Sequence, residues 1–299
     1  MSGKKFIIGT RGSDLALWQA HHVKDKLQKA GFESELLIIK TKGDEIQHLS
    51  LDKIEGKGFF TKEIEEALLS ETIDIAVHSH KDLETQQPTG LSIAAVSLRA
   101  DAREMLIIRK ESFDSTQELS FKSGAIIGTS SSRRKAQILQ LRPDITLEDI
   151  RGNVPTRVDK LRSGKYDAIL LAKAGLDRLN LNLSDVIAIP IDTNLLVPAP
   201  AQGALAIQCR SNDLDAIKAS SVMNDHLTQQ CIQIERGVLA GLKGGCHLPL
   251  GVYATFEEGE FTVEVSYASA WDQPNRKMTF ITDNPVDIVE TIIREITSA

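Results

Sequence analysis

A short sequence occurs twice in this chain, each time where a strand pattern gives way to a helix pattern. Ile7-Ile8-Gly9-Thr10 recurs as Ile126-Ile127-Gly128-Thr129, and a serine stands three residues after each threonine, at Ser13 and Ser132. A second match pairs residues 61–82 with 156–175, where Asp74-Ile-Ala-Val corresponds to Asp167-Ala-Ile-Leu. A chain that repeats a strand–turn–helix unit is expected to form two similar α/β lobes, and we expect these lobes to face each other across a cleft.

Apolar periodicity around the two matches predicts strands alternating with helices, as in a mainly parallel sheet. Ser13 suits the N-cap of a helix whose apolar face carries Ala16, Ala20 and Val23. The other elements expected in the first hundred residues, which form the first lobe, are strands over 4–10, 35–40, 74–78 and 91–96 and a helix over 61–69, and a further strand is expected over 105–109. Residues 41–58 are polar and rich in charge, which predicts a mobile loop.

The pattern changes after residue 213. A long helical stretch through residue 242 is followed by strands over 250–256 and 261–267, a strand near 277–282 and a closing helix with apolar residues on one face. This order predicts a third, smaller α+β unit.

Composition and charge limit the classes of partner. The chain has 299 residues, and its 35 basic and 41 acidic residues give a net charge of −6. General binding to nucleic acid or to an acidic membrane depends on a basic excess, so neither is expected. The sequence shows no signal-peptide pattern and no apolar run of membrane length, and its three cysteines lack Cys-x-x-Cys spacing. We therefore expect a cytosolic protein that holds any anionic ligand with a local cluster.

Basic residues gather at two predicted helix starts in the second lobe. Ser130-Ser-Ser-Arg-Arg-Lys135 directly follows a strand, and Arg151-Gly-Asn-Val-Pro-Thr-Arg157 repeats the arrangement. From residue 128 to residue 165 there are nine Lys and Arg against four Asp and Glu. Free N–H groups at a helix start together with guanidinium groups bind carboxylate or phosphate, although a basic face that is merely solvated remains the alternative.

The first lobe carries its own polar set. Arg11 and Ser13 stand at its first helix start, and His78-Ser-His-Lys-Asp82 follows a strand end, where α/β sheets place ligand residues. The Asp82 carboxylate could steer a cationic centre or move a proton, or it could simply pair with Lys81 or an arginine. His78 and His80 could bind metal, but no further ligand stands at a diagnostic spacing.

Cys246 is the cysteine whose position favours reactivity. It lies in Gly244-Gly-Cys-His-Leu-Pro249, a loop whose paired glycines can expose the thiol. Cys209 and Cys231 lie within apolar segments and are expected to be buried and inert.

Together these stretches resemble the porphobilinogen deaminase (hydroxymethylbilane synthase) family of haem biosynthesis, along essentially the whole chain. The matching stretches are residues 9–13, 16–19, 41–44, 56–63, 74–82, 128–134, 151–157, 199–204 and 244–246. The resemblance implies two α/β lobes like those of periplasmic binding proteins and a smaller α+β domain. Domain 1 would be 1–98 with 197–215, domain 2 would be 99–196, and domain 3 would be 216–299.

The resemblance also implies a reaction. A transferase of this family joins four porphobilinogen molecules head to tail, releasing ammonia each time, to give linear 1-hydroxymethylbilane. The growing chain is primed by a dipyrromethane cofactor, which a thioether bond would hold here to Cys246. The partner would be a small-molecule substrate rather than nucleic acid or membrane, and the protein would be a cytoplasmic monomer.

Carried over position by position, the resemblance assigns roles to residues. Asp82 would be the catalytic residue, facing the pyrrole N–H groups and stabilising the positive azafulvene that forms as ammonia leaves. Gln19 and the loop over 41–58 would belong to a lid. The cofactor would be bound by Cys246, Lys81, Ser79, Thr129, Ser131, Arg133, Arg134 and Arg151, and the substrate by Arg11, Ser13, Gln19, Arg151 and Arg157, with no metal.

The chain departs from the family pattern at three positions. Glu84 stands where the family commonly has proline, Ser132 where it has a hydrophobic residue, and His80 where it has Met or Leu. Glu84 adds a negative charge near the expected catalytic carboxylate and puts the pH optimum in doubt. The rival class is a non-catalytic two-lobed anion-binding protein, which has no use for a covalently loaded Cys246.

Overall fold

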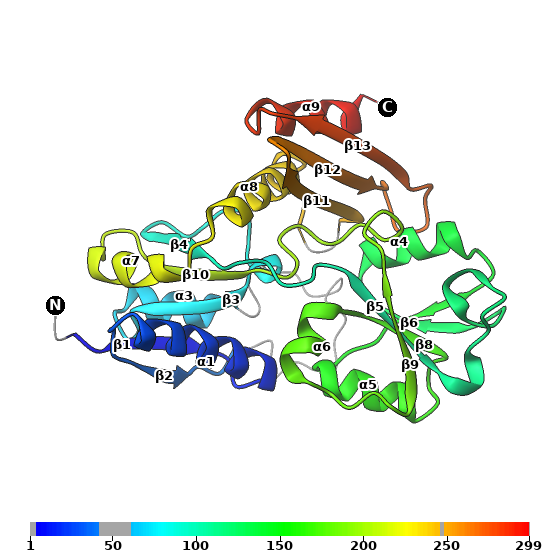
Figure 1. Cartoon of the computed structure of the whole chain (residues 1–299), viewed down its shortest axis with the longest axis horizontal. Helices are drawn as coiled ribbons and strands as arrows, with labels where there is room; N and C mark the ends of the chain where they lie inside the picture. Colours follow the sequence, from blue (N-terminus) through cyan, green and yellow to red (C-terminus); the bar gives the residue numbers. More distant parts are fainter. Residues whose placement is uncertain (1–3, 42–60, 246–247, 299) are drawn as a thin grey trace. The chain divides into compact units, whose positions relative to one another are not determined.

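The computed structural model describes residues 4–41, 61–245 and 248–298. The chain divides into two compact units, residues 1–100 with 203–230 and residues 101–202 with 231–299 (Figure 1). Most of the segment predicted to be a mobile loop, and Cys246 itself, lie outside the described residues.

Unit 1 is built on a five-stranded sheet of order β2-β1-β3-β10-β4. Strand β1 runs parallel to both β2 and β3, whereas β10 runs antiparallel to both β3 and β4. Its elements are β1 (Phe6–Thr10), α1 (Asp14–Lys29), β2 (Ser34–Ile38), α3 (Lys62–Leu69), β3 (Ile75–Ser79), β4 (Leu91–Val96), β10 (Leu205–Arg210) and α7 (Leu214–Ser220).

Unit 2 contains a second five-stranded sheet with the same topology, in the order β7-β6-β8-β5-β9. Strand β6 is parallel to β7 and β8, and β5 is antiparallel to β8 and β9. Its elements are β5 (Glu104–Arg109), β6 (Ile126–Gly128), α4 (Ser132–Leu141), β7 (Thr146–Glu148), α5 (Val154–Arg162), β8 (Ala168–Ala172), α6 (Lys173–Leu179) and β9 (Val186–Ile191). The expected fold class, two α/β sheets with a smaller α+β part, is confirmed.

The expectation of a mainly parallel sheet is wrong. Half of the strand pairings in each five-stranded sheet are antiparallel, because β10 and β5 each run in the opposite direction to both of the strands beside them. The physical reason is the path of the chain: β10 belongs to the first sheet, but it follows all five strands of the second sheet in the sequence. No crossover helix connects β10 to β3 or β4, so nothing requires a parallel arrangement.

One aspartate ties the middle strand to its neighbour in each unit. The Asp74 carboxylate accepts a hydrogen bond from the backbone N–H of Ile7 at 2.9 Å, and the Asp167 carboxylate accepts one from Ile126 at 2.8 Å. In return, the backbone N–H of each aspartate donates to the carbonyl of the same partner. The two matched sequences therefore occupy equivalent positions in the two sheets, with 167 minus 74, or 93, residues between the aspartates.

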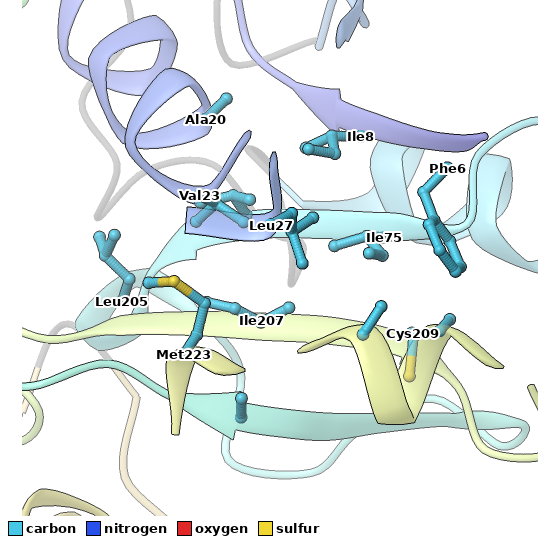
Figure 2. Close-up of a cluster of buried hydrophobic side chains, with 14 residues drawn as sticks. Phe6, Ile8, Ala20, Val23, Leu27, Ile75, Leu205, Ile207, Cys209 and Met223 are labelled. Carbon is cyan, nitrogen blue, oxygen red and sulfur yellow. The ribbon is translucent and has the colours of Figure 1, made fainter. Parts of the chain in front are cut away.

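Helix α1 packs its apolar stripe against the first sheet. Figure 2 shows Val23 and Leu27 of α1 close to Ile75 of β3 and Ile207 of β10, within one buried cluster. Cys209 lies in the same cluster, and burial raises the pKa of its thiol to about 11. Cys209 and Cys231 are both buried and free, as the sequence predicts.

Serine and asparagine side chains begin the helices near the matched sequences. Ser13 accepts from the N–H of Ala16 and caps α1, as predicted, and Asn153 accepts from Thr156 and caps α5. In the second lobe Ser131 caps α4 by accepting from the N–H of Arg134, so the cap lies one residue before Ser132. Such a cap stabilises a helix by about 1 kcal/mol.

The third part contains a three-stranded antiparallel sheet, β11 (Leu250–Glu257), β12 (Glu260–Tyr267) and β13 (Arg276–Thr282). Helices α8 (His226–Gly241) and α9 (Asp287–Thr297) pack their apolar residues against it.

The prediction of a single long helix after residue 213 is wrong, because α7 ends at Ser220 and α8 begins at His226. The Asp225 carboxylate accepts from the N–H of Thr228 at 2.8 Å and so starts a new helix. No helix among the described residues is long and apolar enough to span a membrane.

The Asp167 contact predicts a pH-dependent contribution to stability. Burial raises the pKa of Asp167, but hydrogen bonds from Ile126, Lys122 and Ser112 outweigh it, so the pKa lies below its usual value. A carboxyl whose pKa is lowered in the folded state stabilises the fold fully at pH values above its unfolded pKa, which is about 4. This contribution is lost as the pH falls from there through the folded pKa.

We expect Asp167→Asn to lower the free energy of unfolding by about 2 kcal/mol near neutral pH, because the charged acceptor is lost. Urea unfolding at a series of pH values should show this difference closing below about pH 4. Asp192→Asn, at a side chain that is 72% exposed, is the control and should change little. A difference that stays constant down to pH 3 contradicts the assignment.

Candidate functional site

A pocket in unit 1 gathers the polar residues predicted for the first lobe. It lies at the carboxyl ends of β1 and β3, next to the starts of α1 and α3, where α/β sheets place ligands. Its lining residues are Arg11, Ser13, Leu15, Ala16, Gln19, Thr61, Ile64, Val77, His78, Ser79 and Asp82.

Local structure fixes the side chains of this pocket. Gln19 is buried on α1, and its side-chain amide donates to the Ser79 hydroxyl at 2.8 Å, which joins α1 to the end of β3. Asp82 lies on a single 3₁₀ turn, His80–Asp82, that directly follows β3, and its side chain is exposed. The structure therefore places a carboxylate, a guanidinium and three hydroxyls around one small space.

Lys81 lies on the same turn as Asp82 but is not among the described residues that line the pocket. The backbone N–H of His80 donates to the carbonyl of Ala204 at 3.1 Å, which ties this turn to the segment leading into β10. Residues 75–82 are thus held by the strand that returns from unit 2, rather than by local contacts alone.

The two basic helix starts of unit 2 are joined by one serine. The Ser130 hydroxyl donates to the carbonyl of Ile150 at 2.9 Å and accepts from the N–H of the same residue at 3.0 Å. Thr129 also donates its backbone N–H to the carbonyl of Glu148, and its hydroxyl accepts from the N–H of Ser131. The loops that carry the two arginine-rich sequences are therefore side by side at the carboxyl ends of β6 and β7.

Arg133 and Arg134 are buried, and both pair with the same carboxylate. The Arg133 guanidinium donates to one oxygen of Glu104 at 2.6 Å and Arg134 donates to the other at 2.7 Å. Glu104 is fully buried, and the two arginines are 5% and 6% exposed. Burial lowers the pKa of Arg133, an effect that the Glu104 charge opposes and the neighbouring Arg134 charge reinforces.

The same cluster reaches the segment that leads from unit 2 back to unit 1. Gln202 donates its side-chain amide to Glu104 at 3.0 Å and to the carbonyl of Ala102 at 2.8 Å. The carbonyl of Val197 accepts from Arg133 at 2.9 Å and from Gln137 at 3.0 Å. The sequence reasoning missed Glu104, although a glutamate that opens an otherwise apolar strand was a visible signal.

Arg151 lies on the loop before α5, and Arg157 lies near the start of that helix. Arg157 donates to the carbonyl of Gly152 at 2.7 Å, and Gly152 has a φ of 111°, which favours glycine. Among the described residues of unit 2, two buried guanidinium nitrogens, Nη2 of Arg151 and Nε of Arg134, have no hydrogen-bond partner. Buried donors of this kind are costly unless an acceptor satisfies them, so they indicate a place for an anionic ligand.

One further arginine in unit 2 escaped the sequence reasoning. Arg178 lies on α6, and burial lowers the pKa of its guanidinium to about 10, although the Asp177 charge opposes this. An arginine so strongly desolvated was not apparent from the sequence, because Lys173-Ala-Gly-Leu-Asp-Arg178 resembles an ordinary surface helix.

No group of three or more His, Cys, Asp or Glu side chains within 4–41, 61–245 and 248–298 could hold a metal ion. His78 instead directs its Nε2 to Gln208 at 3.1 Å.

The fold and the site define an α/β protein of two repeated sheets with polar and basic residues at strand ends, extended by an α+β part. A family model described as "Porphobilinogen deaminase, dipyromethane cofactor binding domain" matches residues 6–218. A second, "Porphobilinogen deaminase, C-terminal domain", matches residues 229–280. The chain belongs to the porphobilinogen deaminase family.

Curated relatives agree along most of the chain. Porphobilinogen deaminase of Exiguobacterium sibiricum is 44% identical over 90% of this chain and 86% of its own length. The enzyme of the same name from Lawsonia intracellularis is 46% identical over 84% of this chain and 80% of its own length. That from Bacillus cereus strain G9842 is 45% identical over 88% and 84% respectively.

Solved structures similar to this chain include binding proteins of transport systems. The substrate-binding protein of an amino acid ABC transporter matches with a TM-score of 0.39 and 11% identity, over 76% of this chain and 94% of its own. A periplasmic binding protein of Salmonella typhimurium with high arginine specificity matches with a TM-score of 0.39 and 12% identity, over the same shares of the two chains.

The contacts of Glu104 lead to a prediction on stability. Replacing it by Gln removes the one carboxylate that both buried guanidiniums share, and breaking a buried ion pair from one side costs about 3–5 kcal/mol. We therefore expect Glu104→Gln to lower the unfolding free energy by this amount in urea titrations.

Glu111→Gln is the matched control, since Glu111 pairs with Arg109 at a side chain that is 70% exposed. It should stay within about 0.5 kcal/mol of wild type. Equal effects of the two substitutions would show that Glu104 does not hold the arginine cluster.

Proposed function

We propose that this chain condenses four porphobilinogen molecules head to tail, with release of ammonia, to give linear 1-hydroxymethylbilane. One observation carries the proposal: in a member of this family, a single pocket gathers Asp82 with Arg11, Ser13 and Gln19. A carboxylate beside a guanidinium suits a substrate that carries both acidic side chains and a nitrogen that becomes cationic.

Asp82 is the catalytic residue of this proposal. Its carboxylate is exposed on the turn after β3, next to Arg11, Ser79 and Gln19 in the pocket lining. As ammonia leaves the substrate, positive charge develops on the pyrrole, and a carboxylate placed at that charge stabilises it. The same group can accept the proton that is lost when the carbon–carbon bond has formed.

The basic residues bind the acetate and propionate groups of the pyrroles. In unit 1 this role belongs to Arg11, with Ser13 as a hydroxyl donor. In unit 2 it belongs to Arg151 and Arg157, and the unpartnered Nη2 of Arg151 supports this assignment. Guanidinium groups hold planar carboxylates through paired hydrogen bonds, which explains why a chain of net charge −6 concentrates arginine at these positions.

The residues of unit 2 also fit a dipyrromethane cofactor. The group carries carboxylates, and the buried N–H donors of Arg134 and Arg151 that lack partners among the described residues can donate hydrogen bonds to them. Thr129 and Ser131 add hydroxyls at the same strand end. That Lys81 and Ser79 also bind the cofactor stays a prediction from the family resemblance. When bound through Cys246, the cofactor would supply the terminal pyrrole carbon to which the first unit is joined.

Further features complete the proposal. Three domains, residues 1–98 with 197–215, 99–196 and 216–299, are supported by three separate sheets. A monomer in the cytoplasm and a cleft between the first two domains remain predictions. A non-catalytic anion-binding protein is not favoured, because the curated relatives carry an enzyme name.

Asp82→Asn tests the proposed catalytic role. The change removes the charge and keeps the shape, so we expect turnover of porphobilinogen to fall by at least a hundredfold, with the cofactor still attached. Ammonia release and product formation by the purified protein measure turnover, and the intact mass measures attachment. Asp192→Asn is the control. Turnover within twofold of wild type would refute the assignment of Asp82.

Arg151→Gln tests carboxylate binding in unit 2. We expect impaired cofactor assembly or stalled elongation, seen by mass spectrometry as enzyme carrying fewer pyrroles than wild type. Arg162→Gln is the control, because Arg162 pairs at the surface with Asp185, which is 51% exposed. Elongation by Arg151→Gln at the wild-type rate would contradict the proposed role.

A further inference from the structure

Three polar side chains meet beside the pocket of unit 1. His78 of β3 is buried and lines the pocket, and its Nε2 lies 3.1 Å from the amide oxygen of Gln208 on β10. The amide nitrogen of Gln208 donates to Glu65 of α3 at 3.2 Å and to Gln87 at 2.7 Å. We call Glu65, His78 and Gln208 the polar triad.

The hydrogen bonds fix the protonation of the histidine ring. Gln87 donates its amide nitrogen to the carbonyl of Glu84 at 2.9 Å, so its oxygen is the atom that accepts from Gln208. The amide nitrogen of Gln208 is therefore used on Glu65 and Gln87, and its oxygen faces His78. An amide oxygen only accepts, so Nε2 of His78 carries the proton and Nδ1 is the acceptor of a neutral ring.

The surroundings of His78 keep the ring uncharged. Burial lowers the pKa of His78 to about 4, the bond to Gln208 opposes this, and the charge of Arg11 reinforces it. The other charged groups around it are Asp82, which shares the pocket wall, and Glu65, which is reached through Gln208. Burial raises the pKa of Glu65, and the hydrogen bond from Gln208 opposes this.

Unit 2 has the same sheet topology as unit 1, so the residues that it carries at the three positions matching the polar triad can be compared with the triad itself. The matched aspartates, Asp74 and Asp167, are 93 positions apart. With the same offset, His78 of unit 1 corresponds to Leu171 of unit 2, and Glu65 corresponds to Val158. Gln208 pairs in register with Ala76 of β3, and the residue that pairs with the matching Ile169 of β8 is Ile107.

Leu171, Val158 and Ile107 all lie in one buried hydrophobic cluster of unit 2. The fold therefore does not require polar side chains at the three positions. A buried polar network is retained at a cost that an apolar core avoids, which points to a role outside folding.

We propose that the polar triad serves the reaction rather than the fold, by holding His78 as an uncharged hydrogen-bonding wall of the substrate pocket. The proposal rests on the proposed function. An uncharged ring places no second cation beside Arg11, so the substrate carboxylate is recognised by one guanidinium. It also leaves the charge of Asp82 available for the reacting pyrrole, and Nδ1 can accept from a pyrrole N–H. His78 is thus a substrate-binding residue, and Gln208 and Glu65 are positioning residues.

Nitrogen-15 NMR of histidine in the full-length wild-type protein, with His78→Asn to assign the signal, tests the ring directly. We expect His78 to be the Nε2–H tautomer and to stay neutral from pH 8 to pH 5. An Nδ1–H tautomer, or a titration midpoint above pH 6, would overturn the proposal. In Gln208→Glu we expect the pKa of His78 to rise by at least one unit, because a carboxylate favours the charged ring.

The second test gives unit 1 the residues of unit 2. We expect Glu65→Val/His78→Leu/Gln208→Ile to unfold at the wild-type temperature or above it, while kcat/KM for porphobilinogen falls at least tenfold. Ile207→Val, a core substitution on the same strand, controls for a small loss of stability and should retain activity. Activity of the triple variant within twofold of wild type, or its failure to fold, would show that the triad does not serve the reaction.

These outcomes separate this inference from the proposed function. Wild-type protein that makes no product from porphobilinogen refutes the function, whereas an active wild type with an active triple variant refutes only the role of the triad.

Discussion

The burial of two adjacent guanidiniums around one carboxylate is the interaction on which unit 2 depends. Arg133 and Arg134 follow each other at the start of α4, where the helix dipole already disfavours positive charge. Glu104 compensates by giving one oxygen to each, and Gln202 links the same carboxylate to the chain segment that returns to unit 1. The cluster thus joins a helix start, strand β5 and the segment that connects the units.

The two sheets share one topology, but the side chains at their strand ends differ in chemistry. In unit 1 the carboxyl ends of β1 and β3 carry a single arginine, a carboxylate and several neutral polar groups. In unit 2 the carboxyl ends of β6 and β7 carry the arginine-rich loops, which Ser130 holds together. The buried side chains next to these strand ends differ as well. They are polar beside the pocket of unit 1 and apolar at the matching positions of unit 2. The repeated scaffold therefore carries a polar pocket in one unit and an arginine-rich region in the other.

The sequence predicted what local signals encode. Repeated strand–turn–helix motifs gave both lobes, Ser13 gave a helix cap, and polar runs after strands gave the residues that line the pocket. Contacts between distant residues left no such signal: Gln208 meets His78 across 130 positions, and β10 pairs with β3 only after unit 2 is complete. Asp225 was a readable helix cap that would have divided the predicted long helix. Glu104 could be seen as unusual, but its two arginine partners could not be inferred from its position.

The central claim is that this chain builds its product on a dipyrromethane cofactor attached to Cys246. The intact mass of the purified wild-type protein, measured beside Cys246→Ser, tests this most directly. The account predicts an excess on the wild type equal to two linked pyrroles derived from porphobilinogen, and none on the variant. A wild type that carries no added mass, and gains none after incubation with porphobilinogen or preformed hydroxymethylbilane, would contradict it.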